Sequence, residues 1–232
     1  MIIPARYNGP PASANGGYAC GMLARYLANP AGSEVTLRRP PPLATPMDVR
    51  TTESGIEVYD GDALVASAVP LPAPVGETVP PVGWDEAMDA SQRYPGFADH
   101  PFPTCYVCGP LRPPGDGLRL FAGPLADGRT AAPWVVPEDV EPTLMWAALD
   151  CPGGWSIGLE ARPYVLGRLA ATVEGVPAAG DGCVVMGATV ATEGRKATVL
   201  STVYSPQGTV LARGRAIWLA VNDGFESDRG HG

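Results

Sequence analysis

Histidine is scarce in this chain of 232 residues, which contains only His100 and His231. A Ser-His-Asp catalytic triad would have to use His100, since His231 lies in a polar C-terminal tail. The G-x-S-x-G motif that presents the nucleophilic serine of α/β-hydrolases is absent. A glycine-rich phosphate loop and a dinucleotide-binding fingerprint are absent as well. The sequence therefore lacks the usual signatures of serine hydrolases, nucleotide hydrolases and dinucleotide-dependent enzymes.

Charge is also limited, because charged residues make up only 17% of the chain and the net charge is −8. An acidic protein repels phosphate backbones and anionic membranes, so neither a nucleic acid nor a membrane is an expected partner. No apolar run is long enough to span a bilayer, and the N-terminal residues do not resemble a secretion signal. We therefore expect a cytoplasmic protein whose partner is a small molecule.

The five cysteines are an odd number, which favours reduced thiols in a cytoplasmic chain. Cys105 and Cys108 have the spacing of a metal knuckle, and His100 and Cys151 could complete a set of four zinc ligands. Against this alternative, a second CxxC motif is missing and Cys151 is distant in sequence. We therefore expect a reduced, metal-free cysteine pair, and we predict no metal and no cofactor.

One short passage of the sequence occurs twice. Residues 15–25 read NGGYACGMLAR, and 137 residues later residues 152–162 read PGGWSIGLEAR, with five of the eleven positions identical. A second pair of similar segments follows in the same order: VYDGDALVASA at 58–68 and VYSPQGTVLARGRA at 203–216, each typical of a β-hairpin. This order predicts two half-chains, each with one helix followed by several strands.

We place the first half at 1–75 and the second at 118–222. Residues 76–117 are rich in Pro and Gly and indicate a linker across a surface, with a short helix near 84–92. Residues 223–232 form a polar tail. The predicted strands are Val- and Thr-rich segments. They are SEVTLRR, MDVRTTE and GIEVYDG in the first half, and RLAATVEG, GCVVMGATVAT, KATVLSTVY and TVLARGRAIWLAV in the second.

Glycines recur on one face of each predicted helix. Gly17 and Gly21 are spaced i, i+4 in the first copy, as are Gly154 and Gly158 in the second. Such a smooth face lets a helix lie close to a sheet that curls around it, which is the hotdog arrangement. We predict an α+β double hotdog, in which two tandem domains each wrap a central helix in an antiparallel sheet, with Gly16–Arg25 superposing on Gly153–Arg162.

These motifs resemble the double-hotdog acyl-CoA thioesterase-like proteins, and more closely an actinobacterial-type branch of unknown function. The resemblance spans nearly the whole chain. It is carried by NGGYACG, LRRPPPL, HPFPTCYVCGP, WAALDCPGGW, GRKA and GTVLARGRAIWL. It implies hydrolysis of an acyl-CoA or another acyl thioester, and it allows a homodimer of double hotdogs.

The resemblance also implies a catalytic residue. In the double-hotdog thioesterases an Asp near the second helix activates water with polar partners on later strands, and the match of MWAALDCPGGW gives Asp150 that position. The Gln that such enzymes carry on the last strand would fall near Arg215 or Ala216, where this chain has none. Hotdog dehydratases usually need a His beside their carboxylate, and neither SANGGY nor LDCPGGW offers one, so hydration chemistry is the weaker enzyme hypothesis.

The residues after Asp150 give a physical reason for the same role. Pro152 cannot continue a preceding helix, and Gly153 and Gly154 would open the next one with exposed N–H groups. A thioester carbonyl at this oxyanion site would meet N–H donors while the Asp150 carboxylate orients a water. The matching position of the first half is Ser13, so only one copy keeps a carboxylate.

Two alternatives remain open at this stage. Asp150 could only cap the second helix, which is a common use of Asp, and the chain could be a non-catalytic binder of an acyl or lipid-like ligand. Arg38 and Arg39 could reach the CoA phosphates at the mouth of a groove between the halves. The other expected substrate contacts are Asn15, Gly16, Gly17, Tyr18 and Trp155.

Overall fold

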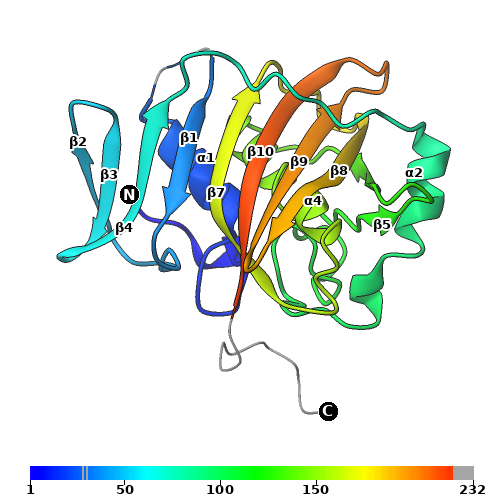
Figure 1. The fold of residues 1–232 in the computed structure, drawn as a ribbon, viewed down its shortest axis with the longest axis horizontal. Helices are drawn as coiled ribbons and strands as arrows, with labels where there is room; N and C mark the ends of the chain where they lie inside the picture. The colour runs from blue at the N-terminus through cyan, green and yellow to red at the C-terminus, as the bar shows by residue number, and fades with distance from the viewer. Residues whose placement is uncertain (28, 30, 222–232) are drawn as a thin grey trace.

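The computed structural model describes residues 1–27, 29 and 31–221 (Figure 1). Its main element is one antiparallel ten-stranded sheet in the order β2-β3-β4-β1-β7-β10-β9-β8-β6-β5. The polar tail expected at 223–232 lies outside the described residues, as does residue 222 at the end of the expected second half.

The strands fall into two groups along the chain. The first group is β1 (Ser33–Leu37), β2 (Asp48–Thr51), β3 (Ile56–Asp60) and β4 (Ala63–Pro70). The second is β5 (Gly123–Pro124), β6 (Thr130–Val135), β7 (Tyr164–Val173), β8 (Gly182–Glu193), β9 (Lys196–Tyr204) and β10 (Val210–Ala220). The predicted strand segments and both predicted hairpins are confirmed, whereas β5 and β6 were not expected.

The strand order repeats within the sheet. The first group and the second group meet where β1 lies beside β7, and we call this boundary the seam. Toward the seam from one side, the strands follow the order β2-β3-β4-β1. Toward the seam from the other side, they follow the order β8-β9-β10-β7. At the seam β1 and β7 pair antiparallel, with Ser33 opposite Ala171 and Thr36 opposite Arg168. Two sets of strands in the same chain order thus share one continuous sheet. This is the arrangement that a double hotdog requires.

The helices are fewer than the strands, and each is short. They are α1 (Gly16–Ala24), α2 (Trp84–Ser91), α3 (Pro142–Ala148) and α4 (Cys151–Trp155), with 3-10 turns η1 (Ala5–Tyr7) and η2 (Pro95–Phe97). The short helix predicted in the linker is α2, which has Asp85 and Glu86 in its first turn. In Figure 1, α1 lies behind β1 and β7, and it contacts both strands.

The second copy of the repeated passage is not one long helix. α4 ends at Trp155, and residues 156–162 form turns in which Gly158 has a φ of 88°, outside the helical region. The predicted helical superposition of Gly16–Arg25 on Gly153–Arg162 is therefore wrong beyond Trp155. The physical reason is that α3, upstream of the repeated passage, already supplies the helix that packs against α1.

The glycine face of α1 consequently meets a helix and not the sheet. A Cβ on Gly17 would lie 2.6 Å from the carbonyl oxygen of Trp146, and one on Gly21 would lie 2.8 Å from that of Thr143. Real Cβ atoms do not approach backbone oxygens this closely, so α3 can contact α1 only where α1 lacks side chains. The i, i+4 glycine pair thus sets the distance between the two helices.

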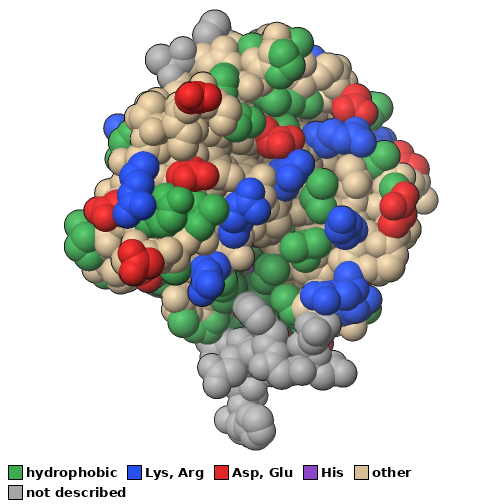
Figure 2. All heavy atoms as spheres, turned by 60° about the vertical axis from the view of Figure 1, so that its left-hand side comes forward, with side chains coloured by type: hydrophobic (Ala, Val, Ile, Leu, Met, Phe, Trp, Pro, Cys, Tyr) green, Lys and Arg blue, Asp and Glu red, His purple; other side chains and the backbone are tan. Residues whose placement is uncertain are grey.

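The outer surface carries charges of both signs. On the face shown in Figure 2, basic and acidic side chains lie interspersed, without one continuous patch of either sign. One exposed ion pair, Arg168 with Glu34 at 3.3 Å, joins β7 to β1 across the seam, and another joins Arg215 to Glu77. Exposed pairs of this kind contribute about 0–1 kcal/mol each. Within the described ranges, no helix has the length and hydropathy to cross a membrane.

Replacing Gly21 by Ala tests the close contact of α1 and α3. The new methyl group would press on the Thr143 backbone, and we expect a loss of about 1–2 kcal/mol in the free energy of unfolding after the helix-propensity gain is subtracted. Urea unfolding measures this loss. Gly76→Ala is the control, because a Cβ there meets no described atom within 4 Å. A Gly21→Ala chain at least as stable as the parent would contradict the packing described.

Candidate active site at the seam between the two halves

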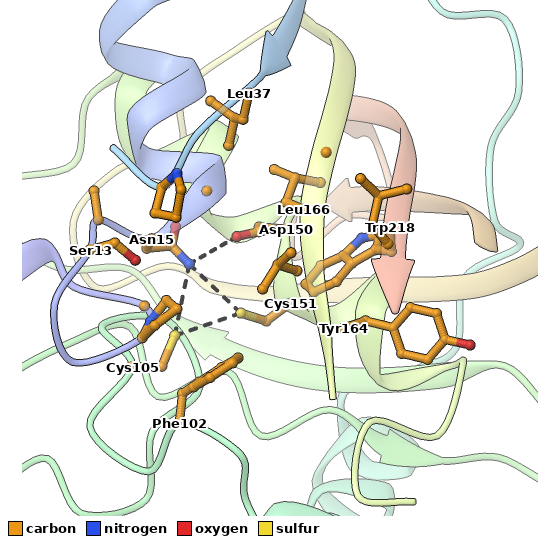
Figure 3. Close-up of a pocket in the computed structure, with 18 of the residues that line it drawn as sticks. Ser13, Asn15, Leu37, Phe102, Cys105, Asp150, Cys151, Tyr164, Leu166 and Trp218 are labelled. Carbon is orange, nitrogen blue, oxygen red and sulfur yellow. Dashed lines mark hydrogen bonds between the residues drawn. The ribbon is translucent and has the colours of Figure 1, made fainter. Parts of the chain in front are cut away.

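A pocket opens where β1 and β7 separate (Figure 3). The two strands are paired only over Ser33–Thr36 and Arg168–Ala171. Beyond this ladder, residues 37–39 on one side and 164–167 on the other line a cavity of about 180 Å³. The end of the β1–β7 ladder therefore positions the pocket, on the line that joins the two halves.

The pocket walls are mostly apolar. An apolar cavity of about 150 Å³ is enough to hold benzene, so this pocket has room for a short acyl chain or one aromatic ring. The apolar side chains in its lining include Leu37, Phe102, Leu159, Tyr164, Leu166 and Trp218.

Polar groups gather at one end of the pocket, around the carboxylate of Asp150. This residue is only 2% exposed, and its Oδ2 accepts hydrogen bonds from the Gly17 backbone N–H and from Asn15 Nδ2, both at 2.9 Å. Its Oδ1 is buried and has no hydrogen-bond partner among the described residues. A buried carboxylate oxygen is costly to leave unpaired, so this atom is a place where a water or a ligand group would be held.

The environment of Asp150 also shifts its proton affinity. Burial raises the pKa of Asp150 to about 7, and the nearby Cys105 acts in the same direction, whereas the Gly17 N–H and the Asn15 amide lower it. The carboxyl group is therefore partly ionised near neutral pH. A group in this range can both accept and return a proton during a reaction.

Asp150 does not cap the helix that follows it. It occupies the position before α4, but its side chain makes no capping hydrogen bond there. It reaches instead to the start of α1, where Asn15 Oδ1 accepts from the Tyr18 N–H and the Asp150 carboxylate accepts from the Gly17 N–H. The alternative in which Asp150 only caps the second helix is therefore wrong, because the carboxylate crosses to the first half.

The predicted oxyanion donors are not at the pocket. A Cβ on Gly153 would lie 2.5 Å from Ser201 Oγ, and one on Gly154 would lie 2.7 Å from the Trp218 ring, so both glycines face the sheet. Neither lines the pocket. The expected convergence of their N–H groups with the Asp150 carboxylate is not found, because α4 turns its glycine face to β9 and β10. α1 begins at the pocket through Gly16, and α4 contributes only its first residue, Cys151, to the lining.

The two aromatic residues expected to contact substrate pack inside the protein. Tyr18 stacks on Tyr7 with ring centroids 3.8 Å apart, and Trp155 lies edge-on to His100 with centroids 5.0 Å apart. Neither lines the pocket. Of the other expected residues, Gly17 contacts Asp150 through its N–H, and the pocket lining includes Ser13, Asn15, Gly16, Arg38 and Arg39.

Sequence reasoning missed the contribution of the linker to the pocket. Its segment 100–108 is mostly buried and places Phe102 and Cys105 in the pocket lining. The expectation of a linker lying across a surface is therefore wrong for this segment. The available signal was the composition of HPFPTCYVCGP, whose aromatic residues and thiols favour burial over an exposed connection.

Solved structures share this architecture over nearly their whole length. A tesB protein from Mycobacterium avium subspecies paratuberculosis has a TM-score of 0.58, covering 96% of this chain and 91% of that chain at 13% identity. A protein from Thermobifida fusca described as a candidate thioesterase II has a TM-score of 0.62, covering 96% and 91% at 13% identity. A conserved protein of unknown function with a hotdog fold, from Alicyclobacillus acidocaldarius, has a TM-score of 0.52, covering 94% and 90% at 12% identity.

These likenesses define the class of fold. The chain is a hotdog protein, and the repeated strand order makes it a double hotdog. More particularly, its fold is the one that the Mycobacterium and Thermobifida proteins have over nearly their whole length. No protein-family model and no curated protein sequence matches the chain.

Asn15 variants test the link between α1 and Asp150. Asn15→Ala removes both the cap on Tyr18 and the amide that holds the Asp150 carboxylate, and we expect a loss of about 2–4 kcal/mol in the free energy of unfolding. Asn15→Ser keeps a capping oxygen and should recover about 1 kcal/mol of this loss.

Urea unfolding of both variants measures these changes. Thr52→Ala is the control, since it removes one local hydrogen bond to Gly55 in a hairpin turn. Equal stability of the parent and Asn15→Ala would show that the α1 start does not depend on this contact.

Proposed function

We propose that this protein hydrolyses an acyl thioester, with an acyl-CoA as the substrate class, and that Asp150 activates the attacking water. The observation that carries the proposal is the buried Oδ1 of Asp150, which has no partner in the described part of the chain and belongs to a residue lining an apolar cavity. A water bound there would be oriented by a carboxylate whose other oxygen is already fixed.

The reaction follows from this placement. As the water oxygen attacks the thioester carbonyl carbon, the Asp150 carboxylate takes one proton from the water. The tetrahedral intermediate then expels the thiolate, which takes that proton, and the products are a carboxylic acid and a free thiol. Negative charge on the carbonyl oxygen would be stabilised by the positive end of the α1 dipole, because Gly16 at the helix start lines the pocket.

Two arginines supply a binding site for the CoA part of the substrate. Arg38 and Arg39 follow β1 at the pocket, and both side chains are exposed. Neither takes part in an ion pair among the described residues. Guanidinium groups bind phosphate through charge-assisted hydrogen bonds, so this pair suits the phosphates of CoA.

A second candidate function is non-catalytic binding of an acyl ligand. It is favoured by the last strand, which contributes only the apolar residues Trp218 and Leu219 to the pocket. At the position expected for a strand Gln, Arg215 is exposed and pairs with Glu77, and Ala216 is buried. Asp150 therefore receives no polar partner from β10.

Replacing Asp150 by Asn separates the two functions. Asn can accept the same hydrogen bonds from Gly17 and Asn15 but cannot act as the base, so the fold should survive while hydrolysis falls by about 10²- to 10⁴-fold. Thiol release from a panel of short-chain and aryl acyl-CoAs measures this effect. The control is Asp89→Asn, which neutralises an exposed carboxylate on α2. Unchanged turnover in the Asp150→Asn chain refutes the catalytic role, and saturable binding without turnover in the parent supports the second candidate.

Removing both arginines tests the CoA contact. We expect Arg38→Ala/Arg39→Ala to raise KM for an acyl-CoA by about 10- to 100-fold with little change in kcat, since each phosphate contact is charge-assisted. Hydrolysis of the same acyl group on N-acetylcysteamine, which has no phosphates, should be unaffected. Arg50→Ala on β2 is the control for a lost surface charge. An equal loss on both substrates would contradict a role in phosphate binding.

A further inference from the structure

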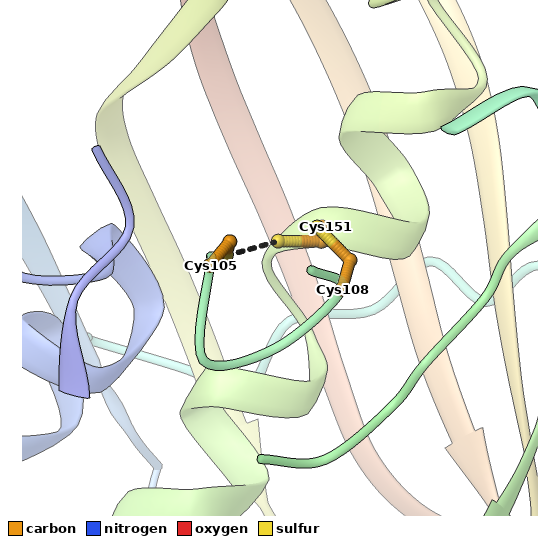
Figure 4. A group of neighbouring side chains, drawn as sticks. All are labelled: Cys105, Cys108 and Cys151. Atoms are coloured by element: carbon orange, nitrogen blue, oxygen red, sulfur yellow. Dashed lines mark hydrogen bonds between the residues drawn. The ribbon is translucent and has the colours of Figure 1, made fainter. Parts of the chain in front are cut away.

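Three cysteines from two distant segments meet at the polar end of the pocket. The sulfur atoms of Cys105, Cys108 and Cys151 all lie within 4.8 Å of one another, and the residues are 2–4% exposed. Figure 4 shows Cys105 and Cys108 on one loop and Cys151 at the start of α4, with their side chains directed toward each other. We refer to these three residues as the thiol cluster.

One sulfur–sulfur distance in the thiol cluster matches that of two zinc ligands. The Cys105 and Cys151 sulfurs are 3.8 Å apart. A tetrahedral zinc ion with Zn–S bonds of about 2.3 Å holds two thiolates about 3.8 Å apart. A disulfide instead requires about 2.05 Å between its sulfurs.

A histidine lies beside the cluster. His100 is 8% exposed, and its Nε2 lies 3.3 Å from the Cys108 sulfur. Tetrahedral coordination would place a histidine nitrogen and a thiolate sulfur about 3.6 Å apart. One Cys and one His thus face each other at nearly the separation that a shared zinc ion needs.

The loop that carries two of the cysteines is shaped to present them together. The Gly109 N–H donates to the Cys105 carbonyl oxygen at 2.8 Å, closing a tight turn over the CxxC segment. A Cβ on Gly109 would lie 2.5 Å from the Cys105 nitrogen, so only glycine allows this turn. Cys105 and Cys108 are therefore held on the same side of the loop.

A hydrogen-bond donor is directed at two sulfurs of the cluster. Asn15 Nδ2 lies 3.8 Å from the sulfurs of both Cys105 and Cys151, so an amide donor points toward them. N–H donors directed at ligand sulfurs are a common outer shell of metal–thiolate sites.

From this geometry we infer that Cys105, Cys108, Cys151 and His100 form a structural zinc site. The three cysteines already lie within 4.8 Å of one another, and His100, which lies outside that group, supplies the fourth ligand once its ring moves closer, as in structural Cys₃His sites. Zinc displaces the thiol protons, and the ion ties segment 100–108 of the linker to α4, one residue after Asp150. The sequence analysis gave two grounds for a metal-free pair, and one of them, the distance of Cys151 in sequence, no longer applies because the fold brings that residue to the CxxC loop.

His100 is the ligand that must adjust most. The Phe102 N–H donates to Nδ1 at 2.9 Å, which leaves the ring proton on Nε2, facing Cys108. Coordination through Nε2 moves that proton to Nδ1 and breaks the Phe102 contact. The histidine should therefore add less to the metal affinity than any of the cysteines.

Metal analysis of the whole chain tests the site. The protein should be produced with added zinc, freed of any histidine tag and purified without chelators, and we expect about one zinc ion per chain. Cys108→Ser and Cys151→Ser should each lose the metal, while Cys183→Ser, a buried cysteine on β8, should retain it. His100→Gln should weaken zinc retention against a competing chelator by at least about tenfold. Retention equal to the parent would overturn the role of His100.

A second measurement uses only the parent chain, so its outcome does not depend on whether the variants fold. Removing the metal from the parent chain with a chelator should lower its thermal midpoint, and adding zinc back should restore it, because an ion bound only by the folded chain stabilises it. Cobalt in place of zinc should show thiolate-to-metal charge-transfer absorption and tetrahedral visible bands. A metal-free protein whose midpoint responds neither to chelator nor to zinc, and which binds no cobalt, would refute the site. These readouts do not involve thioester hydrolysis, so either proposal can fail alone.

Discussion

The hydrogen bonds from Gly17 and Asn15 to the Asp150 carboxylate join the two halves of the chain at a buried point. A carboxylate without partners costs several kcal/mol inside a protein. Here both donors come from the first half, so Asp150 in the second half is paired only when α1 and α3 are docked. The glycine face of α1 permits that approach, and the pocket, the α1 start and the thiol cluster all surround the same carboxylate.

The strands were largely predictable from the sequence, because each is a short Val- and Thr-rich segment bounded by turn residues. The packing of α3 against α1 was not predictable in the same way. The spacing of Gly17 and Gly21 indicates a smooth surface, but whether a helix or a sheet fills the space next to it depends on tertiary packing. Sequence similarity between the two copies of the repeated passage was likewise a poor guide to local structure, since Gly158 adopts a left-handed conformation in one copy.

For the site, the sequence indicated Asp150 as its central residue but not the groups that surround it. The local argument assigned the N–H donors to Gly153 and Gly154, which follow Asp150 directly, whereas the hydrogen bond comes from Gly17, more than a hundred residues away. A contact of this kind depends on how two helices cross. The approach of Cys151 to Cys105 has the same origin, because it requires segment 100–108 to be buried beside α4.

The short β1–β7 ladder holds the two halves together, whereas the residues just beyond it line the pocket. The pocket begins where the pairing of β1 with β7 stops, so the length of this ladder determines how far the pocket extends. Side chains beyond the last β1–β7 pair, such as Leu37 and Leu166, determine its shape. Exchanging those side chains would reshape the entrance without removing a residue pair of the β1–β7 ladder. Extending the ladder by two residues would instead seal the entrance while leaving every side chain on its own face of the sheet. One scaffold of this kind can thus hold ligands of different shapes, or none, through changes at a single strand end.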